Sequence, residues 1–133
     1  MALIAGLKIK TLNQDQAEIT VPYKYLTKNP FQSIYFACLA MAAELSTGIL
    51  GAMAVYKRNP KVSMLIVEMK ANFVKKAVGK ITFTCNDGNA IFYAVEKSMK
   101  TKEGQEVVSK SVGKDEAGNI VADFELSWSF KSK

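Results

Sequence analysis

The sequence contains no histidine, and this absence narrows the chemistry that the protein can perform. A Ser-His-Asp or Cys-His nucleophile system needs an imidazole, and so does a histidine general base. A histidine-rich metal site is excluded for the same reason. Any acid–base chemistry must therefore come from carboxylates, lysine, tyrosine or backbone groups.

Cysteine is also scarce. The two cysteines, Cys38 and Cys85, lie in apolar or alternating segments and are expected to be small buried residues. They indicate neither a disulfide framework nor a zinc site, so we expect a reducing, cytoplasmic location, no metal and no cofactor. The apolar stretch in the opening residues MALIAGLKIK is short and turns polar early, so we do not expect it to act as a secretory signal.

The basic residues are not concentrated in one segment of the sequence. The net charge is +6 at pH 7, but the lysines are scattered along the chain, so a nucleic-acid partner is not expected. Dispersed positive charge suits a small polyanionic molecule at least as well. With 133 residues, 49% of them hydrophobic and 23% charged, residues 1–133 are predicted to form a single domain.

One long apolar segment stands out from the rest. Residues 34–56 read IYFACLAMAAELSTGILGAMAVY, with Glu44 as the only acidic or basic residue, and Lys57-Arg58-Asn59-Pro60 is a helix stop. A helix that is apolar on every side is either a core helix or a membrane span. Many small residues, a central carboxylate and lysines on both flanks argue against a span. We therefore expect a core helix and no membrane span.

Segments with a period of two predict strands on both sides of this helix. The alternating segments 7–10 and 17–21, joined by a polar turn, predict a hairpin. After the helix, residues 90–99 fit either a helix or a strand, and a strand is favoured. The other strands are expected over 62–74, 81–85, 107–112 and 121–130. This order predicts an α+β fold with an antiparallel sheet wrapped around one long helix.

The order of elements, with Asn29 before the helix and Glu44 within it, resembles the hotdog fold of acyl-coenzyme A thioesterases. The likeness is greatest to the phenylacetate-type thioesterases and an allied domain family of unassigned function. It covers nearly the whole chain, from the first hairpin through Phe73-Val74-Lys75-Lys76-Ala77-Val78-Gly79 to the closing strand. The family motif runs from an Asn through His-Gly-Gly to an acid. Asn29 and Glu44 match it, whereas Tyr35-Phe36-Ala37 stands in place of His-Gly-Gly.

The resemblance implies hydrolysis of an acyl-coenzyme A or acyl-carrier thioester at the interface of a homo-oligomer, either a dimer or a dimer of dimers. Glu44 would activate water or attack directly, assisted by Asn29, while the backbone N–H groups of Phe36 and Ala37 would hold the thioester oxygen. A carboxylate in an otherwise apolar helix is expected to be poorly solvated, which favours general-base chemistry. Helix N-termini present unpaired donors suited to a developing oxyanion.

Each of these residues also has a structural interpretation. Glu44 could be a buried carboxylate satisfied by the backbone, Ser46 or Thr47, and Asn29 could be a helix N-cap. Ser46 and Thr47 could hold water or substrate near Glu44, or bond to preceding helix carbonyls instead. Tyr35, which replaces the family histidine, is a possible substrate or water contact but is expected to pack rather than donate a proton. The methionines expected in the core first, and in an acyl pocket second, are Met41, Met53, Met64 and Met69.

A second function remains open: a non-catalytic module that binds an acyl or lipophilic ligand on the same fold. The missing His-Gly-Gly motif supports it, because Phe36 could close the catalytic route. A hotdog dehydratase or hydratase is disfavoured, since the histidine that those enzymes use is absent from the chain.

Overall fold

A computed structural model of the chain describes residues 7–22 and 36–133. Before and including the long helix, these residues form β1 (Lys8–Leu12), β2 (Ala17–Val21) and α2 (Phe36–Val55). The elements that follow are β3 (Val62–Phe73), β4 (Ile81–Cys85), α3 (Gly88–Thr101), β5 (Gln105–Lys114) and β6 (Ile120–Ser132). The predicted α+β class is confirmed, as are the first hairpin and the strands on either side of the long helix.

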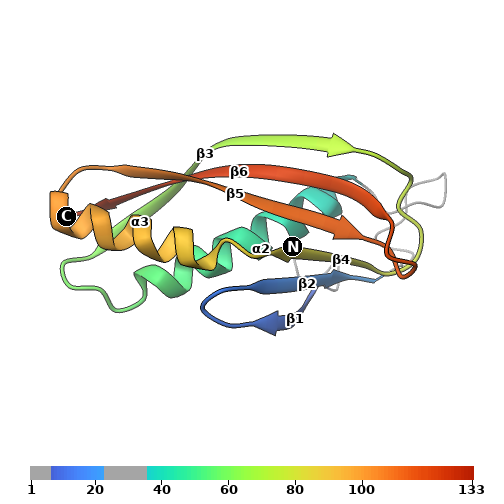
Figure 1. The fold of residues 1–133 in the computed structure, drawn as a ribbon, viewed down its shortest axis with the longest axis horizontal. Helices are drawn as coiled ribbons and strands as arrows, with labels where there is room; N and C mark the ends of the chain where they lie inside the picture. Colours follow the sequence, from blue (N-terminus) through green and yellow to red (C-terminus); the bar gives the residue numbers. More distant parts are fainter. Residues whose placement is uncertain (1–6, 23–35) are drawn as a thin grey trace.

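The strands form one antiparallel sheet in the order β1-β2-β4-β5-β6-β3. The long strand β3 lies at one edge and the short strand β1 at the other (Figure 1). β3 pairs with β6 along its whole length, from Val62 opposite Ser132 to Phe73 opposite Ala122. Its other side has no neighbouring strand in the described sheet.

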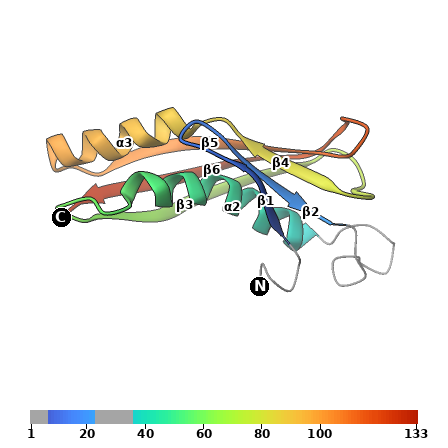
Figure 2. The same cartoon turned by 90° about the horizontal axis from the view of Figure 1, so that it is seen from below.

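The core lies between the inner face of this sheet and α2. Its largest fully buried side chains include Phe83, Phe124 and Phe130, and Trp128 is 7% exposed. The β1–β2 hairpin runs obliquely across α2 and packs against it through β2 (Figure 2). The helix is therefore held between the long strands and the hairpin.

α2 buries one side although its sequence is apolar on every side. Leu39, Ala43 and Leu50 are buried, whereas Ala37 and Ala52 are exposed. By length and composition, residues Ala37–Val55 could also cross a membrane, a test that the core helices of soluble proteins pass as well. In this fold the buried side of the helix packs on the sheet.

The strand favoured for residues 90–99 is wrong, because this segment lies within α3. Its buried residues Ile91, Val95 and Ser98 recur every three or four positions, which is the spacing of one helix face. Lys102 ends the helix in a left-handed conformation (φ 62°), and its N–H donates to the Ser98 carbonyl oxygen. The two-residue alternation that defines a strand does not describe this helical spacing.

The Arg58 side chain links α3 to the end of α2. The Arg58 guanidinium lies 2.7 Å from a Glu96 carboxylate oxygen and 4.8 Å from the centre of the Phe92 ring. Its Nε donates to the Ala54 carbonyl oxygen at 2.8 Å, which also caps the last turn of α2. The two helices are thus held side by side at this end of the molecule.

Candidate functional site

Glu44 projects from α2 into solvent in the single chain. Its neighbours Ala43 and Ser46 are fully buried, so the exposed Glu44 lies at the margin of the buried side of the helix. The expectation that this carboxylate is poorly solvated is therefore wrong for the isolated chain. The same holds for the structural interpretation of Glu44 as a buried carboxylate.

Two glycines show where the Glu44 side of α2 points. A Cβ atom added at Gly48 would lie 3.2 Å from the Trp128 ring, and one added at Gly51 would lie 2.8 Å from the Met64 methyl group. Gly48 and Gly51 follow Glu44 by four and seven residues, so all three lie on one side of the helix. Glu44 therefore lies on the side of α2 that points toward β3 and β6.

The pairing of β3 with β6 shows which strand residues the Gly48 and Gly51 side of α2 meets. Opposite Gly51 is the pair Met64–Phe130, and opposite Gly48 is Trp128, which pairs with Ile66. The next inward pair along these strands is Met69–Leu126. Glu44 lies one helical turn before Gly48, in the direction of this pair along the strands.

The second half of β3 presents an apolar surface at this level. We call Met69, Ala71 and Phe73 the β3 shelf; these residues pair with the buried residues Leu126, Phe124 and Ala122 of β6. The shelf residues nonetheless remain exposed, Met69 by 39% and Phe73 by 52%. An exposed carboxylate and an open apolar surface thus lie in the same direction from Gly48, which is an arrangement that can place a base near a hydrophobic substrate.

This geometry corrects part of the expectation for the methionines. Met69 and Met53 are exposed rather than buried in the core. Met64 is half-buried and packs against the core, and Met41 is half-buried on α2. Met69 is exposed because α2 covers the first half of β3, where Met64 lies, and leaves the shelf open.

Ser46 and Thr47 are both fully buried. Ser46 Oγ donates to the Ala43 carbonyl oxygen at 2.8 Å, and Thr47 Oγ1 donates to the Glu44 carbonyl oxygen at 3.1 Å. Of the two roles open to these hydroxyls, bonding to preceding carbonyls is confirmed. They are enclosed by the core, so solvent water beside the Glu44 carboxylate does not reach them.

The other predicted site residues lie before or at the start of α2. Asn29 and Tyr35 fall outside the described residues, and so does the side chain of Phe36. Ala37 is exposed in the first described turn of α2. Amide groups in a first helical turn lack intrahelical acceptors. Ala37 lies seven residues before Glu44, which corresponds to a distance of about 10 Å along the helix axis.

Burial disfavours a nucleophilic role for the two cysteines. Burial raises the pKa of the Cys85 thiol to about 11, and burial also raises the pKa of Cys38. Thiols of this kind are protonated near neutral pH and therefore react poorly. Within residues 7–22 and 36–133, no three or more Cys, Asp or Glu side chains are grouped so that they could hold a metal ion.

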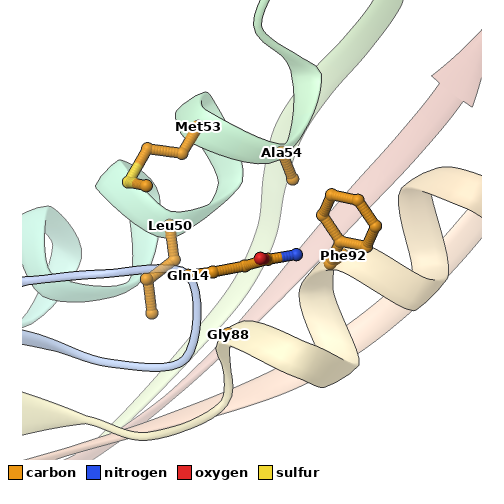
Figure 3. Close-up of a pocket in the computed structure, with 6 residues that line it drawn as sticks. All are labelled: Gln14, Leu50, Met53, Ala54, Gly88 and Phe92. Carbon is orange, nitrogen blue, oxygen red and sulfur yellow. The ribbon is translucent and has the colours of Figure 1, made fainter.

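A separate cavity of about 320 Å³ opens between the β1–β2 turn, α2 and α3 (Figure 3). Its lining residues are Gln14, Leu50, Met53, Ala54, Gly88 and Phe92. The Gln14 amide extends into the cavity toward Phe92. The sequence pattern does not reveal this cavity, because it favours a strand for the segment that forms one wall as α3.

Comparison with known proteins places this fold. The model of a family described as a domain of unknown function (DUF4442) matches residues 3–130. No protein of curated function matches the sequence. A Pseudomonas aeruginosa protein of unknown function, PA5026, described as a probable thioesterase, is similar with a TM-score of 0.86 at 21% identity, covering 100% of this chain and 89% of that one.

Two further solved structures are described as thioesterases. HI1161 from Haemophilus influenzae has a TM-score of 0.73 at 15% identity, covering 98% of this chain and 82% of that one. A mutant form of PA1618 from Pseudomonas aeruginosa has a TM-score of 0.74 at 12% identity, covering 99% of this chain and 86% of that one. The chain therefore has the hotdog fold, as predicted.

Proposed function

This chain belongs to the DUF4442 family of domains of unknown function, and from this family, its hotdog fold and its exposed carboxylate we propose that it hydrolyses acyl-coenzyme A or acyl-carrier thioesters. The observation that carries the proposal is that Glu44 is exposed on the side of α2 that faces β3 and β6, one helical turn beyond Gly48 in the direction of the β3 shelf. The shelf offers apolar contact to an acyl group, and the carboxylate supplies the base. The thioesterase descriptions of structural neighbours support the same reaction class.

In the proposed reaction Glu44 takes a proton from a water molecule as the water oxygen attacks the thioester carbonyl carbon. The tetrahedral intermediate then collapses, the carbon–sulfur bond breaks, and the thiolate recovers the proton from Glu44. Direct attack by Glu44 would instead break the carbon–sulfur bond first, forming a mixed anhydride and releasing the thiolate; water then hydrolyses the anhydride to the acid, regenerates the Glu44 carboxylate and supplies the proton that the thiolate takes up. In both routes the negative oxygen needs donors, which we assign to the Phe36 and Ala37 amides, with Asn29 orienting the substrate.

We further propose that the working unit is a homodimer joined along β3. This strand is twelve residues long and forms an edge of the sheet, with no further strand beside it among residues 7–22 and 36–133. It also exposes apolar side chains, among them Leu65 at 65% and Val67 at 48%. An exposed, long apolar edge is the kind of surface that a second strand covers. A partner there would enclose the β3 shelf and reduce the solvation of Glu44.

The second candidate is a non-catalytic module that binds acyl groups on the shelf. The observation that favours it is Tyr35-Phe36-Ala37 in place of the His-Gly-Gly motif. Such a module would bind acyl-coenzyme A without hydrolysing it.

The test is thioester hydrolysis across short, medium, long and aromatic acyl-coenzyme A substrates, with Glu44→Gln compared with the wild type. Loss of the general base should lower turnover by about 100-fold or more. Because Glu44 is exposed, the free energy of unfolding should change by only about 0.5 kcal/mol.

Glu103→Gln is the matched control, since Glu103 is also exposed but follows α3, outside the candidate site. It should leave turnover unchanged. Equal turnover in the wild type and Glu44→Gln would contradict the assigned base. Binding without hydrolysis of any substrate would favour the non-catalytic module.

A further inference from the structure

Hydrophobic burial alone does not determine which side of α2 faces the sheet. From Phe36 to Val55 the helix is apolar on every side, and Glu44 is its only charged residue. Rotating such a helix exchanges one set of apolar side chains for another, so the change in buried apolar area is small. Some other interaction must select the rotation that turns the Glu44 side of α2 toward β3 and β6.

A first buried hydrogen-bond relay connects β6 to the backbone of Glu44. The Trp128 indole N–H donates to Thr47 Oγ1 at 2.9 Å, and Thr47 donates its own proton to the Glu44 carbonyl oxygen at 3.1 Å. Thr47 is fully buried and Trp128 is 7% exposed. The hydroxyl uses both its donor and its acceptor capacity, so the relay has a defined direction.

A second relay connects β5, through Ser46, to the backbone carbonyl of Ala43, the residue before Glu44. Ser46 Oγ donates its only proton to the Ala43 carbonyl oxygen at 2.8 Å. Ser111 must therefore be the donor in the 2.6 Å bond between the Ser46 and Ser111 hydroxyls. This relay, too, runs from a donor on the sheet to a helix hydroxyl and then to a helix carbonyl.

We infer that these two relays, Trp128–Thr47–Glu44 and Ser111–Ser46–Ala43, lock the rotation of α2 and thereby aim Glu44 at the β3 shelf. Successive helical residues point about 100° apart, so anchors at positions 46 and 47 hold the helix from two directions. Rotation would leave the Trp128 indole and the Ser111 hydroxyl buried without partners, which is strongly unfavourable. Thr47, Ser46, Ser111 and Trp128 are thus positioning residues, and this inference rests on the proposed role of Glu44.

The first test compares Thr47→Val, which removes the hydroxyl at nearly equal size, with Thr47→Ser, which retains it. Thr47→Val should lower kcat by about tenfold with little change in KM, because a misplaced base slows the chemical step more than binding. Thr47→Ser should restore turnover. Adding Ser111→Ala to Thr47→Val releases both anchors and should increase the loss to about 100-fold.

Ser98→Ala is the matched control for these variants. Ser98 is a fully buried helix serine that donates to the Val95 carbonyl oxygen at 2.7 Å, but it lies on α3. It should lose stability comparably and keep its kcat per folded molecule. If Ser98→Ala and Thr47→Val lower kcat equally, or if Thr47→Ser fails to restore it, the lock is refuted.

A second readout does not depend on activity. In a Cys38→Ala background, Glu44→Cys and Leu45→Cys report by their thiol-labelling rates which of the two positions faces solvent. With the relays intact, position 44 should label faster, because Glu44 is exposed and Leu45 is half-buried. Thr47→Val with Ser111→Ala should change this ratio by about threefold or more, as expected for a rotated or mobile helix.

An unchanged labelling ratio would overturn the lock whatever the activity. If Glu44→Gln leaves turnover intact while the ratio changes, the lock stands and the assigned base fails. The two proposals therefore fail on different measurements.

Discussion

Gly88 allows the β1–β2 turn to touch the start of α3. A Cβ atom at this position would lie 2.0 Å from the Gln14 carbonyl oxygen, which is a backbone atom that cannot swing away. The Gly88 N–H also donates to the Asp15 carbonyl oxygen at 3.1 Å. Because Gly88 has no side chain, the β1–β2 hairpin can contact α3 directly. Gly88 also lines the cavity in Figure 3.

Gly88→Ala should destabilise the protein by about 3 kcal/mol, because the turn must move away from α3. Urea unfolding of the variant and the wild type measures the difference. Gly104→Ala is the control, since a Cβ there meets no atom within 4 Å, and its unfolding free energy should change by about 0.5 kcal/mol at most. Equal effects of the two substitutions would show that the close contact is relieved at little cost.

At the scale of elements, the loop between β5 and β6 is organised by Asp115. Its Oδ1 accepts the N–H groups of Asn119 at 2.9 Å and Ala117 at 3.1 Å, and its Oδ2 lies 3.5 Å from Lys75 Nζ. The backbone hydrogen bond from Asn119, followed by the charge of Lys75, lowers the pKa of Asp115. The ionised form is therefore favoured in the folded protein.

A lowered folded-state pKa contributes stability above the ordinary carboxyl value, and this contribution is lost as the pH falls through the lowered pKa. Asp115→Ala should thus be less stable than the wild type at neutral pH, and the difference should shrink in acid. Urea midpoints measured from neutral to acidic pH test this. Asp115→Asn, which keeps an acceptor but does not titrate, should fall between the two at neutral pH. Parallel pH profiles of the wild type and Asp115→Ala would contradict the assignment.

At the scale of the whole molecule, the long edge strand and the β3 shelf lead to the proposed dimer. Leu65→Asp places a charge on the edge of β3, where Leu65 is 65% exposed. We expect the dimer dissociation constant to rise by about tenfold or more, because a charge on an edge strand opposes pairing. Sedimentation velocity over a range of protein concentrations measures the change.

Tyr93→Asp on α3 is the matched control for the dimer, since Tyr93 is 67% exposed on a different element. It should leave the oligomeric state unchanged. Turnover should fall together with dimerisation in Leu65→Asp if the partner completes the site. A monomer with full turnover would show that one chain suffices.

Local patterns in the sequence determined most of the elements. The alternation in 17–21 and 121–130 predicted β2 and β6, because strand periodicity follows from the backbone itself. The unbroken apolar segment that stops at Lys57-Arg58-Asn59-Pro60 predicted α2. The absence of histidine excluded whole classes of catalytic site by composition alone.

The solvation of Glu44 could not be determined in this way. A helix that is apolar all round has no preferred face, so its rotation depends on partners that are distant in sequence. The Trp128 indole that bonds Thr47 lies 81 residues further along the chain. Only the tertiary structure brings the two together, and with them it decides that Glu44 is exposed, that Ser46 and Thr47 are buried, and that Met69 lies on an open shelf.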